Sequence, residues 1–394
     1  MSEHLDSSIV IVAAKRTAIG SFQGQFQSTP APELGACAIK EAIASSELDP
    51  NDIDQVIMGC VLPAGLGQAP ARQAALAAGL PLGTGAITIN KVCGSGMQAI
   101  MLAHDLIKAG SAQCVVAGGM ESMTRAPYLM DRGLRMGHSK ALDHMFFDGL
   151  QNPYDGQMMG QFAELCADHH QFSRQQQDDF AKTSVERAMA AMASGAFKEE
   201  IAPLVVNTRK GEICIDQDEE PPRCNIDKMP SLRPAFAKDG TVTAASSSKI
   251  SDGAAAVIVM TEQMAKDKGL VPLARIKAHA THAQEPEWFT TAPVGAMTKV
   301  LEKAQWSATD VDLYEINEAF ATVTMAAIEA HRLDPTRVNV HGGALALGHP
   351  IGASGARLVV TLIHALKQHQ KQTGIASLCI GGGEATALAI ESIA

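Results

Sequence analysis

The sequence has no apolar run of the ~18–20 residues that a membrane-spanning helix needs, although hydrophobic residues make up 46% of its 394 residues. Residues 1–17 do not combine a basic region with an apolar segment, so we expect no secretory signal there. Their acidic character is also unlike a mitochondrial transit peptide. Residues 391–394 differ from a peroxisomal address of the Ser-Lys-Leu kind. We therefore expect no association with a membrane.

Basic clusters are absent as well. The chain has 32 Lys and Arg residues against 42 Asp and Glu residues, which gives a net charge of −10, and no block of like charge stands out. Because a phosphate backbone is bound by a basic face, we expect no nucleic-acid partner. Aromatic residues make up only 4% of the chain, whereas glycine occurs 34 times. This composition favours closely packed layers.

The chain also has no Cys-x-x-Cys pair among its eight cysteines, so the spacing indicates neither a zinc site nor thioredoxin-like chemistry. We accordingly predict no metal ligands. Free cysteines in so long a chain are typical of a reducing compartment, and we expect the cytoplasm.

Strand-like and helix-like patterns alternate over the first 120 residues. Strands rich in Val and Ile are predicted at 7–14, 55–62, 86–90 and 114–119. Helices are predicted at 31–46 and 96–110. The second of these is apolar on nearly all sides, which is typical of a helix buried between two sheets. The alternation predicts an α/β layered fold.

Residues 120–251 differ in texture, because they are rich in methionine and carry polar stretches and an acidic run. We interpret them as an insertion with some helices and long loops. After it the alternation resumes, and the expected elements are strands at 273–283 and 375–383 and helices at 317–333 and 352–369.

The two ends of the chain resemble each other. The first has a strand, a glycine-rich turn holding Cys93, a buried helix and the strand "CVVAGGMES". The second has a predicted strand at 337–343, a glycine-rich turn holding His349, a helix from about Ala353, and "SLCIGGGEA". This predicts an internal duplication. If the halves pack about a pseudo-dyad, Cys93 and His349 face one site.

Three features suggest chemistry. Cys93 lies where a helix begins, and helix N-terminal amides favour a thiolate. His349, in its glycine-rich turn, is a candidate base for a nearby thiol. Cys379 ends a strand beside three glycines, whose N–H groups are candidates to bind an oxyanion. Taken singly, each has a purely structural interpretation.

Together these segments resemble the thiolase family, and the likeness runs nearly end to end. Its motifs are "KVCGSGMQAI", "YEINEAFA", "NVHGGALALGHPIGASGAR" and "CIGGGE". The resemblance implies two similar βαβαβαββ halves packed as five layers (αβαβα), with an inserted loop domain. It places the N-terminal half at 1–120, completed by about 251–271, the loop domain at 121–250, and the C-terminal half at 272–394.

The resemblance also implies residue roles. Cys93 matches the nucleophile that takes the acyl group, and His349 matches the base that activates it. Cys379 matches the second cysteine, which removes or returns an α-proton. Asn317 matches the residue that orients a water, which with His349 holds the enolate oxygen. The N–H groups of Cys93 and Gly381 match the second oxyanion hole.

A set of substrate contacts follows in the same way. Ser248 matches the serine that contacts pantetheine. Arg223 is a candidate for the nucleotide end of coenzyme A, with a solvated surface arginine as the alternative. Phe289 lies where a methionine often shapes the acyl pocket, and Ser246-Ser247-Ser248-Lys249 replaces a frequent Asn-Ala-Ser-Gly. The remaining candidates for an apolar lining are Leu150, Met159, Phe236, Ala244, Ala319 and Phe320.

The expected activity is that of an acetyl-CoA C-acetyltransferase, which joins two acetyl-CoA by ping-pong kinetics through acyl-Cys93. The alternatives are a 3-ketoacyl-CoA thiolase for longer chains, a ketosynthase, and a non-catalytic acyl-CoA-binding protein. The ketosynthase family pairs its cysteine with two histidines, whereas this chain has Cys379 in the third position. We expect no cofactor, since the coenzyme A thioester is the substrate, and we expect a homotetramer.

Overall fold

The N-terminal half of the chain alternates strands and helices as its sequence pattern predicts. The computed structural model describes residues 8–208 and 211–393, so Ser7, the first residue of one predicted strand, lies outside the described residues. The elements are β1 (Ile9–Thr17), α2 (Ala31–Ser46), β3 (Gln55–Gly59), α3 (Pro70–Ala77), β4 (Gly85–Ile89), α4 (Ser95–Lys108), β5 (Cys114–Ser122) and, after a long excursion, β11 (Ser251–Thr261).

The C-terminal half repeats this order with one strand missing. Its elements are β12 (Ala274–Ala283), α8 (Ala292–Ala304), β13 (Leu313–Ile316), α9 (Ala321–His331), α10 (Ala344–Leu347), α11 (Ser354–Gln368), β14 (Thr373–Ile380) and β15 (Glu384–Ser392). The helix predicted at 317–333 begins at Ala321, four residues later than expected. Phe320, the residue before it, is still extended, with φ −141° and ψ 156°.

The strand predicted at 337–343 is wrong. Asn339 adopts a left-handed φ of 49°, which interrupts an extended chain. The side-chain amide of Asn339 makes the hydrogen bonds to Ile316 that the backbone of a neighbouring strand would otherwise make. Its Oδ1 accepts from Ile316 N at 2.8 Å, and its Nδ2 donates to Ile316 O at 2.8 Å. An isolated bridge between Tyr314 and Val338 marks the place of the missing strand.

The strands form one hydrogen-bonded sheet that covers both halves, in the order β13-β14-β15-β12-β1-β11-β5-β3-β4. The halves join where β1 and β12 pair antiparallel over two positions, Val10 with Arg275 and Ile11 with Ala274. These are the first strands of the two repeats, as a pseudo-dyad requires.

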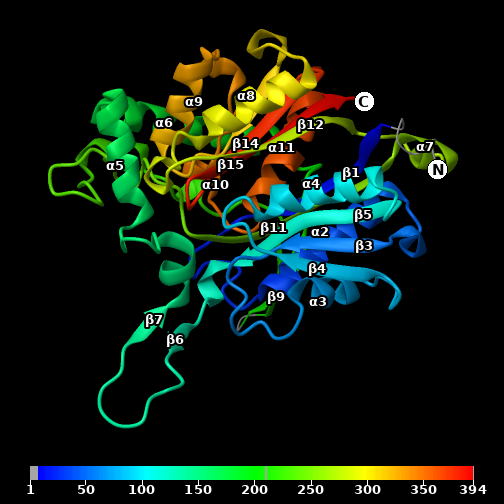
Figure 1. Ribbon diagram of the computed structural model, residues 1–394, viewed down its shortest axis with the longest axis horizontal. Coiled ribbons are helices and arrows are strands. Elements are labelled where there is room, and N and C mark those ends of the chain that lie inside the picture. The colour runs from blue at the N-terminus through cyan, green and yellow to red at the C-terminus, as the bar shows by residue number, and fades with distance from the viewer. Residues whose placement is uncertain (1–7, 209–210, 394) are drawn as a thin grey trace.

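The two arms of this sheet enclose α4 and α11, while α2 and α3 cover one outer face and α8 the other (Figure 1). This arrangement gives the five alternating layers that were predicted.

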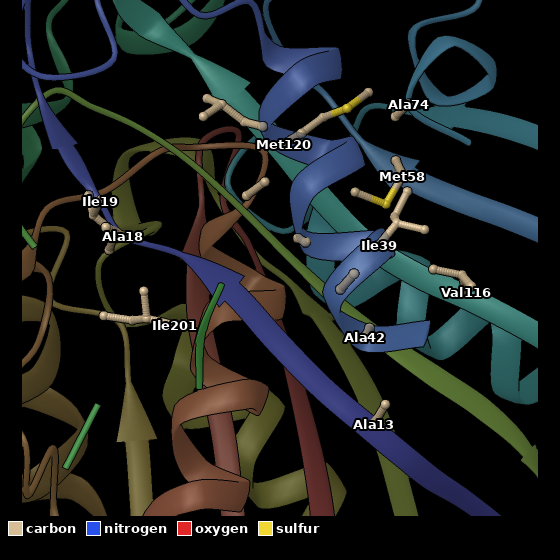
Figure 2. Packing of buried hydrophobic residues seen from close by; sticks show 14 of the residues in the cluster. Ala13, Ala18, Ile19, Ile39, Ala42, Met58, Ala74, Val116, Met120 and Ile201 are labelled. Carbon is tan, nitrogen blue, oxygen red and sulfur yellow. The ribbon is translucent and has the colours of Figure 1, made fainter. Parts of the chain in front are cut away.

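Strand β1 shows why the interior is layered. Val10 and Val12 belong to the apolar cluster on the α2 side, whereas Ile9 and Ile11 belong to the cluster around α4 and α11. A strand with both faces covered is apolar throughout rather than alternating. Figure 2 shows the α2 side, where Ile39 and Ala42 of α2 lie over Met58 of β3 and Val116 of β5.

Helices α4 and α11 cross at equivalent glycines. A Cβ atom at Gly96 would lie 2.8 Å from Ala356 N, and one at Gly355 would lie 2.5 Å from Met97 N. Any side chain at either position would push the helices apart. Because each helix follows a catalytic-looking turn, this close crossing brings the two turns together.

The middle of the chain holds separate helices and hairpins. Its elements are β6 (Tyr128–Met130), β7 (Ala141–Asp143), α5 (Met159–His170), α6 (Arg174–Ser194), β8 (Ile201–Ala202), β9 (Leu204–Thr208) and β10 (Gly211–Ile215). The β6–β7 hairpin extends away from the layered body (Figure 1). Within residues 8–208 and 211–393, the helices are too short or too polar to cross a membrane.

Candidate active site

Cys93 lies in a constrained turn between β4 and α4. The residue before it, Val92, adopts a left-handed φ of 46°, which is a costly conformation for a β-branched residue. Ser95 holds the turn, because its Oγ accepts from Lys91 N at 2.8 Å and donates to Val92 O at 2.7 Å. The side chain of Cys93 is partly buried. The strained turn therefore fixes the thiol at the start of a buried helix, as the sequence predicted.

His349 lies in the equivalent turn before α11. Its Nδ1 is 2.6 Å from Ser354 Oγ, and that hydroxyl donates to Pro350 O at 2.9 Å. A hydroxyl has one proton to donate, so Ser354 accepts from His349 and the ring proton is on Nδ1. Nε2 is therefore unprotonated, and its lone pair is the one that can accept a proton. Burial, together with the positive charge of Arg357, lowers the pKa of His349 to about 3, so the ring is neutral at physiological pH.

Asn317 and His349 meet within the site. Asn317 Nδ2 is 3.5 Å from His349 Nε2, and both side chains are buried. Asn317 Oδ1 is buried without a hydrogen-bond partner among the described residues. The two motifs, 32 residues apart in sequence, therefore meet around one ring nitrogen.

Cys379 and Gly381 bring the end of β14 to Cys93. Burial raises the pKa of the Cys379 thiol, and negative charge on Cys93 would raise it further. Burial also raises the pKa of Cys93 to about 11, although the N–H groups of Gly381 and of Cys93 itself act on the pKa in the opposite direction. The two thiols therefore share one small region with the two predicted oxyanion donors, and both are protonated at neutral pH.

A cavity of about 220 Å³ opens beside these groups. Six predicted site residues line it, namely Leu150, Met159, Phe236, Ser248, Phe320 and His349. Further lining residues that the sequence did not single out as site residues are Met123, Phe146, Met158, Gly160, Ser247, Lys249, Ile250 and Ile351. Cys93 packs against the apolar cluster that contains Met123 and Ile351 of this wall. The cavity is thus a mainly apolar channel that leads to the thiol.

Other predicted contacts lie outside this wall. Phe289 and Ala319 are buried in the cluster that contains Cys379 and Phe320, so they form a second layer. Ala244 is exposed. The guanidinium of Arg223 is 2.9 Å from the carboxylate of Glu219, and its side chain is 57% exposed.

The family models for the N-terminal domain and the C-terminal domain of thiolase match residues 9–263 and 270–392. The chain belongs to the thiolase family. The two matches together cover both halves of the layered fold.

Proteins with similar sequences match this thiolase along nearly its whole length. An acetyl-CoA acetyltransferase of Pseudomonas aeruginosa is 48% identical, with 97% of this chain and 98% of that protein covered. One from Cupriavidus necator is 48% identical over 98% of this chain and 99% of the relative.

Solved structures of similar proteins also match nearly the whole chain. The crystal structure of the Bacillus anthracis acetyl-CoA acetyltransferase has a TM-score of 0.95 and 40% identity, covering 98% of this chain and 99% of that one. A thiolase from Ascaris suum in complex with coenzyme A has a TM-score of 0.93 and 42% identity, covering 98% and 100%. The similarity therefore extends to the whole fold.

Glu121 lies behind the candidate site and bonds to segments of both halves. The sequence did not single it out as a site residue. Its buried carboxylate accepts from the N–H groups of Val61 at 2.9 Å, Leu62 at 3.2 Å and Gly352 at 2.9 Å. Burial raises its pKa to about 7. The contact with Gly352 joins the N-terminal half to the turn that holds His349. An acidic residue at the end of an otherwise apolar strand was the available signal.

Proposed function

We propose that the protein is an acetyl-CoA C-acetyltransferase, which joins two acetyl-CoA into acetoacetyl-CoA and coenzyme A reversibly. The observation that carries this proposal is the grouping of two thiols, one neutral imidazole with an unprotonated Nε2, and Asn317 at a mainly apolar cavity. The names of the relatives at 48% identity support the same activity. No cofactor takes part, because the thioester supplies the activated acyl group.

The first half-reaction transfers the acetyl group to Cys93. His349 Nε2 accepts the Cys93 proton, and the thiolate forms a bond to the carbonyl carbon of acetyl-CoA. The oxyanion is stabilised by the N–H groups of Cys93 and Gly381, which also lower the pKa of the Cys93 thiol. When the carbon–sulfur bond to coenzyme A breaks, its thiolate takes the proton back from His349. A base is needed because burial keeps the thiol protonated.

The second half-reaction forms the carbon–carbon bond. Cys379 first gives its thiol proton to His349 Nε2. The Cys379 thiolate then takes a proton from the methyl group of a second acetyl-CoA, and the enolate oxygen is held by the new Nε2–H of His349 and by a water on Asn317. The enolate carbon then attacks the acetyl group on Cys93. As the thioester breaks, the Cys93 sulfur receives the α-proton from Cys379, and Cys379 takes its own proton back from His349, which returns both cysteines to their starting state. The unpaired Oδ1 of Asn317 supports its role in holding the water.

Coenzyme A reaches the thiols through the cavity in this scheme. Leu150, Met159 and Phe236 pack against pantetheine, and Ser248 contacts its polar groups. Phe320 belongs to the same wall, with Ala319 and Phe289 behind it. Arg223 remains a candidate for the nucleotide end, which extends beyond the cavity, and Ala244 remains a candidate for the apolar lining. The eight cysteines, all free thiols, support a reducing compartment, and we propose the cytoplasm.

A substrate-length series tests the specificity. Phe289 lies edge-on to Phe162 and to Phe320, with ring centroids 6.4 Å apart in both pairs, and this aromatic group packs with Cys379. Because it leaves little room for a long acyl chain, we expect thiolysis of acetoacetyl-CoA to exceed that of a long-chain 3-ketoacyl-CoA by at least ~10-fold in kcat/KM. Equal or greater rates on long chains would favour the alternative, a 3-ketoacyl-CoA thiolase of fatty-acid degradation.

The β6–β7 hairpin supports a homotetramer. Its exposed apolar side chains are Tyr128, Met130, Leu134, Met136 and Leu142. A cluster of this kind on a projecting arm is typical of an interaction surface. We therefore predict that replacing residues 131–140 with a two-residue Asn-Gly turn lowers the mass in light scattering from tetramer to dimer. An unchanged mass for the shortened protein, or a monomer for the intact one, would contradict this assembly.

A further inference from the structure

A histidine–aspartate cluster lies outside the site described above. His104 and Asp105 belong to α4, and His279 belongs to β12 of the other half. His104 Nδ1 and His279 Nε2 are each 2.9 Å from Asp105 Oδ1, and the two nitrogens are 3.2 Å apart. Three potential ligand atoms therefore converge on one point from two separate elements.

We propose that this cluster binds a divalent transition-metal ion, with Zn²⁺ as the best fit. In a tetrahedral zinc site, bonds of ~2.0–2.1 Å place neighbouring ligand atoms ~3.3 Å apart. The separations of 2.9 Å and 3.2 Å in the cluster need only a small expansion to reach this value. Two imidazoles and one carboxylate suit zinc, nickel or cobalt, whereas magnesium and calcium prefer oxygen ligands throughout.

The exposure of the cluster fits such a site. The side chains of His104 and His279 are 17% and 16% exposed, so their rings are held by packing, whereas Asp105 is 58% exposed. The open side leaves a fourth position for water. Two cations lie near: Lys303 Nζ donates to His279 O at 3.0 Å, and the charge of Lys108 acts on His104. They reduce the affinity for a cation but do not occupy the ligand atoms.

The ion would stabilise the fold rather than take part in the chemistry. His104 follows Cys93 by eleven residues, most of them helical, which places it ~16 Å along the chain at 1.5 Å per residue. The ion would instead tie α4 to β12 and so join the two halves. His104 and His279 are 175 residues apart, so no short ligand spacing marks the site in the sequence.

The test compares metal binding by the full chain and two variants. We expect His279→Gln to bind one Zn²⁺ fewer than the unchanged protein in equilibrium dialysis, or to bind it at least ~100-fold more weakly. Zn²⁺ should also raise the unfolding temperature of the unchanged protein by a few degrees and that of the variant by less. The matched control is His170→Gln, which removes a histidine paired with Glu329 at 2.7 Å and leaves the cluster intact.

Cysteine binding must be separated from this site. Co²⁺ bound through thiolate gives an intense ligand-to-metal absorption, whereas Co²⁺ on the cluster gives only weak visible bands that His279→Gln should remove. Asp105→Asn changes an exposed side chain and serves if His279→Gln fails to fold. Equal stoichiometry, affinity and thermal shift in the unchanged protein and in a folded variant would overturn the proposal, as would no binding by the unchanged protein.

Discussion

Replacing Cys93 with alanine is expected to lower kcat/KM for acetoacetyl-CoA thiolysis by ~10⁴-fold or more. The Cys93 thiol is the group that we expect to carry the acetyl group, since the N–H groups of Gly381 and of Cys93 itself act on its sulfur and favour the thiolate. Cys93→Ser should lose nearly as much, because an alkoxide forms far less readily than a thiolate and its ester is a poorer acyl donor. Both variants should keep the far-UV spectrum and the unfolding temperature within a few degrees.

The measurement combines thiolysis rates with the intact mass of the protein after incubation with acetyl-CoA. The unchanged protein should gain one acetyl group that both variants lack. Cys214→Ser is a matched control, because Cys214 is an exposed thiol on the β9–β10 hairpin. Activity above a few per cent in Cys93→Ala would contradict the nucleophile assignment. An unchanged protein that never becomes acetylated would instead favour a non-catalytic acyl-CoA-binding protein.

The layered fold was predictable because its central elements are apolar on nearly all sides. An apolar pattern around the whole of α4 and along β1 leaves few arrangements other than helices between two sheets. The prediction of a strand at 337–343 was wrong for a local reason. Asn339 uses its own amide to bond Ile316, so the segment joins the sheet region without strand geometry. Such side-chain-to-backbone substitution is invisible to hydrophobic periodicity.

The proposed reacting groups were found from the sequence, since Cys93, His349, Asn317 and Cys379 lie in motifs that resemble those of thiolases. Their roles stay predictions. The residues that hold these groups in position were not found from the sequence. Ser354 fixes the tautomer of His349, and its role depends on an angle that only the folded turn defines. Glu121 reaches Gly352 across 231 residues. Such residues act through three-dimensional contacts, and a single serine or glutamate in sequence has many other uses.

The predicted substrate contacts were only partly placed at the cavity. Residues beside a motif, such as Met159 and Ser248, lie at the cavity as expected. Phe289 is one layer behind the wall because Phe320 stands in front of it. Whether a side chain is in the first or second layer depends on the packing of neighbours that are distant in sequence.

Cys379→Ser is expected to separate the two half-reactions. A serine hydroxyl keeps the volume of the buried thiol but is a much weaker acid, so it neither takes nor returns the α-proton effectively at neutral pH. We expect condensation and thiolysis to fall by ~10²–10⁴-fold, which is the usual contribution of general acid–base catalysis. Acetyl transfer to Cys93 uses His349 rather than Cys379. It should therefore fall by less than ~10-fold.

Exchange of labelled coenzyme A into acetyl-CoA measures the first half-reaction alone, because it needs only acetyl transfer to Cys93 and back. The proper comparison is His349→Asn, which removes the base for both half-reactions and should reduce exchange and condensation together. Ser354→Ala leaves the ring in place but frees Nδ1, so it should weaken both to a smaller extent than His349→Asn. Equal losses of exchange and condensation in Cys379→Ser would show that the two cysteines do not divide the work. A selective loss of condensation assigns the proton transfer to Cys379, because a general disturbance of the cavity would impair exchange as well.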